Sequence, residues 1–224
     1  MFGNSTPVRS NQDGTHPHLI NLLERHRQAW RKPVSAHTRQ AFEQACAYWE
    51  AAGRPPLVLD AACGTGASTL QLAGQWPDHL VIGVDQSADR LARGPAAHAG
   101  SPDNLLLVRA DVADFWRLLA DAGMRLARHY LLYPNPWPRK QHVQRRWHGH
   151  PAFPLLLELG GQLECRSNWK TYVDELAIAL QHLAAGVVLV DAVPEGLPLT
   201  PFEKKYRASG HALWRCRCAL TQPG

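Results

Sequence analysis

Cysteine is scarce in this sequence, and the few cysteines are not arranged in pairs. The 224-residue chain has five of them, none in a CxxC spacing. An odd, scattered set argues against a disulfide framework and against a zinc ribbon, and it favours a reducing, cytoplasmic environment. No complete ligand set accompanies His16 and His18 either, so we expect no metal.

Long apolar runs are also missing. The run VVLVDAV at 187–193 is far shorter than the roughly 20 residues that span a bilayer. The N-terminal residues contain no apolar signal core. We therefore expect no membrane partner.

Acidic residues are absent from one long stretch of the chain. No Asp or Glu occurs between Asp121 and Glu158, although six Lys or Arg residues and four His residues lie there. From Glu203 onward, five further basic residues accompany that single acid. The formal net charge of +5 is therefore local in origin, because the remaining chain is net acidic. Such clustered positive charge permits a polyanionic partner.

Short apolar runs alternate with amphipathic segments over most of the chain. Residues 1–18 are polar and predict a flexible arm, and two helical patterns follow within 19–53, separated by Pro33 with Ser35 as an N-cap. The next expected elements are strands, and the last of them is an antiparallel edge strand: 57–61, 80–85, 104–111, 129–133, 162–166, 187–191 and 211–220. This alternation predicts an α/β fold, a doubly wound and mostly parallel seven-stranded sheet over 57–220 with an N-terminal helical extension. We expect residues 19–224 to form one domain.

A glycine-rich turn follows the first predicted strand, in LVLDAACGTG at 57–66. Gly64 and Gly66 would let the backbone approach a ligand closely. Asp85 ends the second strand, 19 residues after Gly66, where an acid accepts hydrogen bonds from ribose hydroxyls. Asp111 ends the third strand, within reach of an adenine edge. Each acid is equally compatible with a helix N-cap.

Two residues distinguish this turn from a dinucleotide-binding one. Asp60 lies in the strand before the glycines, and Thr69 stands where a GxGxxG motif has its third glycine. The combination resembles the S-adenosylmethionine site of class I methyltransferases, which have a Rossmann-like fold. In such sheets Asp60, Asp85 and Asp111 would converge on one crevice at the carboxyl ends of the strands.

A rigid, basic loop follows the fourth predicted strand, in HYLLYPNPWPRKQHVQRRW at 129–147. Two prolines around Asn135 stiffen the chain where this fold carries catalytic groups. Trp137 is of the type that stacks on a base, and four side chains are of the type that binds phosphate: Arg139, Lys140, Arg145 and Arg146. The competing interpretation is a solvated loop with Trp137 buried. Trp169 likewise either stacks on a base or buries itself at the start of a helix over 169–184.

Several motifs in the right order resemble those of one family. The loop at 129–147 is similar to the FPDPW-x-K-x-RHNKRR segment of bacterial tRNA (guanine-N7)-methyltransferases, the TrmB-like family, and LVLDAACGTG matches its cofactor loop. Further stretches resemble its other motifs: VRS at 8–10, RSNWKTYVDE at 166–175, and LTPFEKKY at 199–206 with GH at 210–211. The resemblance implies a cytoplasmic enzyme, a monomer or weak homodimer, that uses S-adenosylmethionine to methylate N7 of a guanine in the tRNA variable loop.

The resemblance also implies roles for individual residues. Cofactor contacts would come from the glycine turn and the strand-end acids, namely Asp60, Gly64, Gly66, Asp85 and Asp111. Contacts with tRNA or its guanine would come from Arg139, Thr200 and Glu203. The Glu203 carboxylate would accept the donors on the Watson–Crick edge of guanine, although pairing with Lys204 or Arg207 is an alternative for it.

Two positions depart from the family pattern. The aspartate of the family's PDP motif, which is catalytic or contacts the cofactor, is Asn135 here, and the aspartate of its TDW motif, on the substrate side, is Asn168. Each change deletes a negative charge. N7 of guanine has a free lone pair, so methyl transfer needs in-line positioning and tolerance of a cationic purine but no general base. We therefore expect slower catalysis and not its complete loss.

Three hypotheses about function remain open at this point. The first is an active tRNA guanine-N7 methyltransferase with altered electrostatics, and we favour it. The second is a divergent methyltransferase that acts on another nucleobase or on a small molecule. The third is a tRNA-binding protein that has lost methyl transfer.

Overall fold

The computed structural model describes residues 3–26, 32–95, 100–183 and 186–220, which fold into two compact units. One unit comprises residues 32–130, and the other combines the N-terminal 31 residues with the chain from Leu131 onward. Seven strands of the described residues form one mixed sheet. No helix among the described residues is long and apolar enough to cross a membrane.

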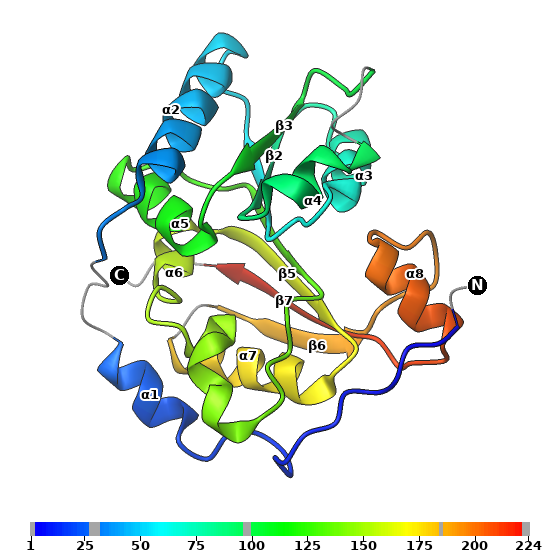
Figure 1. Cartoon of the computed structure of the whole chain (residues 1–224). Coiled ribbons are helices and arrows are strands. Elements are labelled where there is room, and N and C mark those ends of the chain that lie inside the picture. Colours follow the sequence, from blue (N-terminus) through cyan, green and yellow to red (C-terminus); the bar gives the residue numbers. More distant parts are fainter. Residues whose placement is uncertain (1–2, 27–31, 96–99, 184–185, 221–224) are drawn as a thin grey trace. The chain divides into compact units, whose positions relative to one another are not determined.

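The unit of residues 32–130 is built on parallel strands in the order β3-β2-β1-β4. These are β1 (Leu57–Ala61), β2 (Leu80–Asp85), β3 (Leu105–Arg109) and β4 (Arg128–Leu132), the last of which runs into the other unit. Every residue of β1 and β2 is buried, as their continuous apolar runs predict. Helices α2 (Ala36–Ala51) and α5 (Val112–Asp121) pack together, while α3 (Ala67–Gln75) and α4 (Ala88–Ala92) pack against β2 and β3 (Figure 1).

The core of this unit contains one polar pair. Trp116 of α5 and His129 of β4 are both fully buried, and the indole Nε1 donates a hydrogen bond to His129 Nε2 over 3.1 Å. Burial lowers the pKa of His129 to about 3, so the ring is neutral and able to accept this proton. This bond satisfies Nε2 of His129, while Nδ1 has no hydrogen-bond partner among the described residues.

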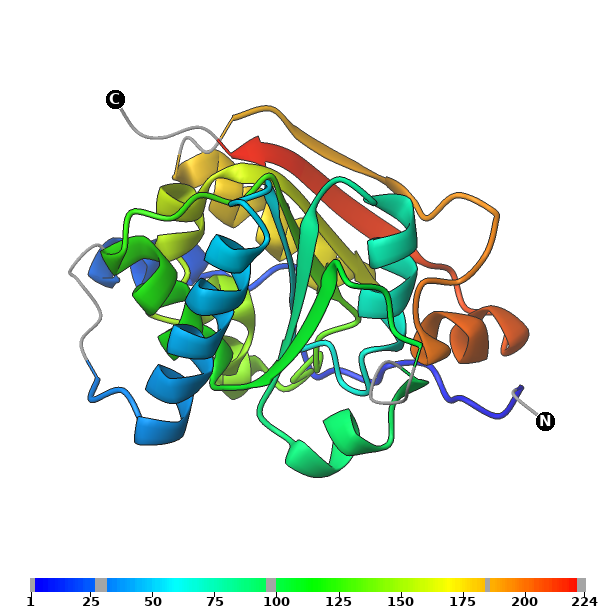
Figure 2. The same cartoon turned by 90° about the horizontal axis from the view of Figure 1, so that it is seen from above.

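The other unit carries the antiparallel part of the sheet. Its strands β5 (Gly161–Ser167), β7 (Trp214–Leu220) and β6 (Val188–Ala192) are ordered β5-β7-β6, and α7 (Lys170–His182) packs on all three. The prediction that 211–220 is antiparallel is confirmed, but its predicted place at the edge is wrong, because β7 lies between β5 and β6 (Figure 2). The edge strand is β6, whose Leu189 is 50% exposed.

The alternation of β7 explains this arrangement. Cys216 and Cys218 are buried on one face, while Arg215 and Arg217 on the other both bind the carboxylate of Asp191 on β6. A period-two pattern identifies a strand with one polar face but does not say whether a second strand pairs beyond it. Charged pairs of this kind cover an exposed edge.

Polar groups of the N-terminal arm find partners within the same unit. Ser5 N donates to Ser209 Oγ, Ser10 Oγ donates to the Pro138 carbonyl, and Asn11 Oδ1 accepts from Lys140 N. Helix α1 (Leu19–Arg25) then packs on α7. The remaining elements of this unit are η2 (Lys140–Arg145), η3 (Trp147–Gly149), α6 (Leu155–Leu159) and α8 (Pro201–Ala208).

A buried carboxylate on α7 gathers four donors from three parts of this unit. Glu175 Oε1 accepts from Gln12 Nε2 at 2.5 Å and from His16 N at 2.8 Å. Glu175 Oε2 accepts from Arg146 Nη1 at 2.5 Å and lies 2.8 Å from His148 Nε2. The side chains of Glu175, Arg146 and His148 are fully buried.

The charge states of this cluster follow from its contacts. Although burial alone would raise it, the pKa of Glu175 falls to about 2 because of His148 and Arg146. Burial lowers the pKa of His148, so its imidazole is neutral and donates from Nε2. The cluster is thus a buried ion pair with a neutral histidine as an additional donor.

We predict that Glu175→Gln destabilises the protein by about 3–5 kcal/mol, because it leaves the Arg146 guanidinium buried without a counter-charge. In the wild type, the stability contributed by Glu175 is complete above its unfolded pKa of 4.5 and is lost as the pH falls toward 2. Urea unfolding of both proteins from pH 3 to pH 8 tests this. Arg54→Gln, which breaks an exposed pair with Glu50, is the control and should change stability by less than about 1 kcal/mol.

Candidate cofactor site and nucleic-acid surface

Both glycines of the turn in the 32–130 unit adopt positive φ values. Gly66 precedes α3 with a φ of +74°, a conformation that favours glycine. The backbone after α4 then passes directly over this turn, because a Cβ added at Gly94 would lie 1.6 Å from the Thr65 carbonyl oxygen. Gly94 is not predictable from the sequence, since a single glycine so far downstream of the turn belongs to no motif.

Asp85 anchors the turn from the end of β2. It is only 2% exposed, and its Oδ2 accepts from Gly64 N at 2.9 Å. Its Oδ1 accepts from Ser87 N at 2.8 Å and lies 3.0 Å from Nη2 of Arg90, a half-exposed side chain. Asp85, predicted as a ribose acceptor, therefore stabilises the glycine turn, and Arg90 occupies part of its hydrogen-bonding capacity.

Asp60 lies beneath the same turn. The carboxylate is fully buried, and its Oδ2 accepts from Ser68 Oγ at 2.6 Å and Thr69 Oγ1 at 2.7 Å. Its Oδ1 has no hydrogen-bond partner among the described residues. Burial raises its pKa to about 6, against the effect of the two hydroxyls. An orphaned acceptor with a carboxylate at this depth fits a cationic group bound at the turn, so the donor set is compatible with S-adenosylmethionine.

Asp111 serves as the N-cap of α5. Its Oδ1 accepts from Asp114 N at 3.0 Å, and its Oδ2 accepts from Gln86 Nε2 at 2.5 Å. Its own N–H donates to Thr38 Oγ1. The capping interpretation is confirmed for this acid, and its side chain stays partly exposed.

The rigid loop after β4 belongs to the other unit. Tyr133 and Trp137 have positive φ values, 52° and 43°, on either side of Asn135. Asn135 is exposed, and its Oδ1 accepts from Trp137 N over 3.2 Å, which closes a local turn. Strained backbone at two non-glycine residues around one exposed amide is typical of a functional loop.

The basic residues of this loop divide into exposed and buried ones. Arg139, Lys140 and Arg145 are exposed, and the Arg145 guanidinium lies 4.7 Å from the centre of the half-buried Trp137 ring. The predicted contact of Arg146 with the RNA backbone is wrong: its guanidinium is fully buried against Glu175 and cannot reach a phosphate. The sequence alone does not distinguish Arg146 from the three exposed cations, because all four are basic residues of one short segment.

Trp169, for which stacking on a base and burial were both open, is buried. It is 9% exposed and stands immediately before α7. The Arg146 guanidinium lies 4.8 Å from the centre of its ring. The indole therefore lines the buried charge cluster and is not available to stack on a base.

The predicted guanine-binding pair also has a structural role. Thr200 Oγ1 accepts from Glu203 N at 2.9 Å, which caps the N-terminus of α8. The Glu203 carboxylate is fully buried and accepts from Arg166 Nη1 at 3.0 Å and Arg207 Nη2 at 2.9 Å. Its prediction as an acceptor for the guanine edge does not fit this arrangement, because both oxygens are occupied and inaccessible.

Asn168 forms a chain of hydrogen bonds that sequence reasoning missed. Its Nδ2 lies 3.1 Å from His211 Nδ1, and His211 Nε2 lies 2.9 Å from the Ser5 carbonyl. With the amide donating to Nδ1, the imidazole is neutral and donates from Nε2. The ring of Tyr206 stacks on His211 at 5.3 Å. The GH motif at 210–211 was the available signal for this partner.

Known proteins resemble this chain in sequence and in fold. A family model described as a putative methyltransferase matches residues 54–216. The chain belongs to this methyltransferase family. Within it, the tRNA (guanine-N(7)-)-methyltransferase of Anaeromyxobacter dehalogenans is 34% identical over 184 residues, which cover 76% of this chain and 87% of that protein. The corresponding protein of Ectopseudomonas mendocina is 32% identical over 176 residues, which cover 71% of this chain and 70% of that protein.

Solved methyltransferases share the fold of this family member. The 16S rRNA (adenine(1408)-N(1))-methyltransferase of Catenulisporales acidiphilia, solved with S-adenosylmethionine, matches with a TM-score of 0.57 and 19% identity over 80% of this chain and 92% of that one. The 16S rRNA methyltransferase KamB matches with a TM-score of 0.56 and 16% identity over 85% and 97%. Identities this low speak for the α/β fold alone.

We predict that Asp60→Asn stabilises this methyltransferase while it weakens cofactor binding. Because the folded pKa of Asp60 is raised from 3.8 to about 6, its ionisation lowers the stability of the fold as the pH rises through that interval. The neutral amide removes this penalty, so the free energy of unfolding at pH 7.5 should rise by about 1–2 kcal/mol. Thermal unfolding at pH 4 and pH 7.5 measures the stability, and titration calorimetry measures binding of S-adenosylmethionine. Unchanged cofactor affinity would contradict the assignment of Asp60.

Proposed function

We propose that this protein transfers the methyl group of S-adenosylmethionine to N7 of a guanine in tRNA, and that this guanine lies in the variable loop. The observation that carries the proposal is the relationship to the Anaeromyxobacter dehalogenans enzyme, at 34% identity over 87% of its length. Two features of the structure also support it, the glycine turn with its nearby acids and the exposed basic loop.

The cofactor is proposed to bind at the turn of the 32–130 unit. Gly64 has open space beside its backbone, and Asp60 and Asp85 place negative charge around the turn. Asp111, through its partly exposed carboxylate, is the candidate for the adenine side. S-adenosylmethionine supplies an electrophilic methyl group on a sulfonium.

The remaining requirement is to position a purine, since N7 attacks with its own lone pair and needs no base to remove a proton. Asn135 is the candidate for this task, because it is exposed and rigidly held between two prolines and two strained residues. Its amide oxygen is a partial negative charge where the family has a carboxylate. The purine becomes cationic on methylation, so a weaker charge at this point gives weaker stabilisation of the transition state.

RNA binding is assigned to exposed cations of the same loop, Arg139, Lys140 and Arg145. Each stands on or next to η2, and none is enclosed by a carboxylate in the way that Arg146 is. Asn168 supports the surface indirectly through His211. Thr200 and Glu203 enter the proposal as residues that hold α8 and not as guanine ligands.

The proposed enzyme acts in the cytoplasm as a monomer or weak homodimer. All five cysteines are free thiols, which fits a reducing compartment. Burial raises the pKa values of the thiols of Cys63 and Cys165 well above the usual one, so neither is a nucleophile for the reaction.

One alternative has a specific observation in its favour. Asn135 and Asn168 both lack the charge that the family motif carries, as expected for a protein that binds tRNA without methylating it. Such a protein would bind tRNA through the same cations.

We expect the purified protein to form 7-methylguanosine in tRNA isolated from cells that lack this modification. The measurement is incubation with methyl-labelled S-adenosylmethionine followed by nucleoside mass spectrometry. A tRNA transcript with adenine in place of the variable-loop guanine is the matched control and should stay unlabelled. Binding of both cofactor and tRNA without any label in RNA would establish the binding protein, and label in another nucleoside would establish a divergent specificity.

Asn135→Asp is predicted to raise kcat, by up to about 100-fold, because it restores a full negative charge beside the ring that becomes cationic. Aspartate accepts the Trp137 N–H as asparagine does, so the loop geometry should persist. Asn168→Asp is the comparison: an aspartate there requires a proton on His211 Nδ1, so its effect should instead appear in stability and in its dependence on pH. Steady-state kinetics with saturating cofactor measure both variants. If Asn135→Asp binds cofactor normally but kcat stays the same, the lost charge is not what limits this enzyme.

A further inference from the structure

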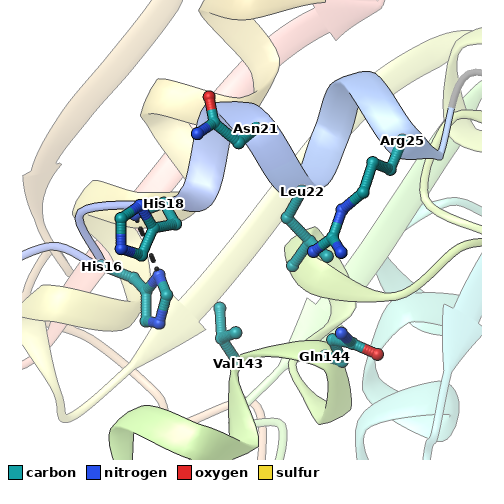
Figure 3. A pocket seen from close by; sticks show the side chains of 7 residues that line it. All are labelled: His16, His18, Asn21, Leu22, Arg25, Val143 and Gln144. Atoms are coloured by element: carbon teal, nitrogen blue, oxygen red, sulfur yellow. Dashed lines mark hydrogen bonds between the residues drawn. The ribbon is translucent and has the colours of Figure 1, made fainter.

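A groove lies between α1 and η2, apart from the residues assigned so far. It has a volume of about 550 Å³. It is lined by residues of the arm, of α1 and of η2: His16, His18, Asn21, Leu22, Arg25, Val143 and Gln144 (Figure 3). All of them belong to one compact unit.

The groove has an apolar floor and polar walls. Leu22 and Val143 are 2% and 7% exposed, so they form a closed surface from the two elements. His18, Asn21, Leu22 and Arg25 are spaced i, i+3, i+4 and i+7, which places them along one stripe of α1. A small apolar floor between polar walls suits a group that is apolar on its faces and polar at its edges, as a nucleobase is.

The polar walls contain donors from His16, Arg25 and the two amides, together with the amide oxygens as acceptors. His16 Nδ1 accepts from His18 N at 3.2 Å, so the neutral ring carries its proton on Nε2 (Figure 3). Burial lowers the pKa of His16, which keeps this ring neutral. Arg25 contributes a permanent charge, and Gln144 contributes an amide.

No carboxylate lines the groove. The nearest acid in sequence, Glu24, is turned to His182 of α7, and Glu175 is buried beneath the arm, where it holds His16 N. No group of three His, Cys, Asp or Glu residues that could hold a metal ion gathers in the described part of the chain. Donors without a competing acid match a phosphodiester.

We propose that this groove binds one nucleotide unit of the RNA, with its phosphodiester on Arg25 and its base over Leu22 and Val143. The inference rests on the proposed function in taking tRNA as the RNA. Continuity of the surface supports it, because Gln144 in the groove wall adjoins Arg145 and shares η2 with Lys140. A strand held by those two cations continues into the groove. The buried cluster keeps the groove preformed, since Glu175 binds both His16 and Arg146, and Arg146 ends η2.

The test is direct binding of unmodified tRNA to Arg25→Gln and Gln144→Glu, by fluorescence anisotropy at several salt concentrations. Each variant should bind about tenfold more weakly at low salt. For Arg25→Gln, the slope of log K against log salt should fall by about 0.7–0.9, the amount for one phosphate contact. Arg25→Lys should restore most of that slope, because it keeps the charge.

Arg39→Gln is the matched control. It removes one exposed charge from α2 and should leave the affinity within about twofold of the wild type. Thermal unfolding of all variants checks that these exposed substitutions leave the fold intact. Affinity and salt slope of Arg25→Gln equal to those of the wild type would overturn the proposal, and so would an equal loss in Arg39→Gln, which indicates a general charge effect.

A second measurement does not depend on the energy of one contact. A photo-crosslinking amino acid in place of Gln144 should capture tRNA, and the same amino acid in place of Gln40 on α2 should not. Neither measurement requires methyl transfer. If the protein forms no 7-methylguanosine but crosslinks at position 144, the proposed function is wrong and RNA binding in the groove is supported. If it methylates tRNA without crosslinking, the function is supported and RNA binding in the groove is wrong.

Discussion

The carboxylate of Glu175 is the point on which the unit with the basic loop depends. It is buried, its charge is fully ionised, and it binds groups from the arm, the loop and η3. A charge at this depth is stable only with complete pairing, so each of these segments is held in one place by the need to satisfy the others. This cluster therefore positions both the exposed cations of the loop and the groove beside α1.

The glycine turn follows a different physical logic, in which one acid, Asp60, is held at a cost to stability. Asp85 is fully engaged with backbone donors and Arg90, whereas Asp60 keeps an oxygen without a partner and a raised pKa. The ionised form of such a carboxylate destabilises the folded state. A cationic ligand would compensate it, which is the common trade between stability and function at binding sites.

Much of the fold was predictable because the apolar runs are short and continuous. β1 and β2 begin and end where the runs do, and the glycine turn lies between them. The errors concern position across the sheet and not the elements themselves. The edge strand was assigned to 211–220 because alternation reveals a polar face, yet that face of β7 is paired with Asp191 of β6.

The sequence by itself determined the class of fold, the family and the residue types available at the two sites, since these depend on local periodicity and on motif order. Only the tertiary structure decided which of those residues are free to act. Arg145 and Arg146 are neighbours in the sequence, yet Arg145 is exposed whereas Arg146 is buried. Arg146 forms an ion pair with Glu175, which lies 29 residues further along the chain. Glu203 is likewise removed from the solvent by Arg166 and Arg207. Availability depends on burial and on long-range pairing, and neither is encoded in the spacing of residues along the chain.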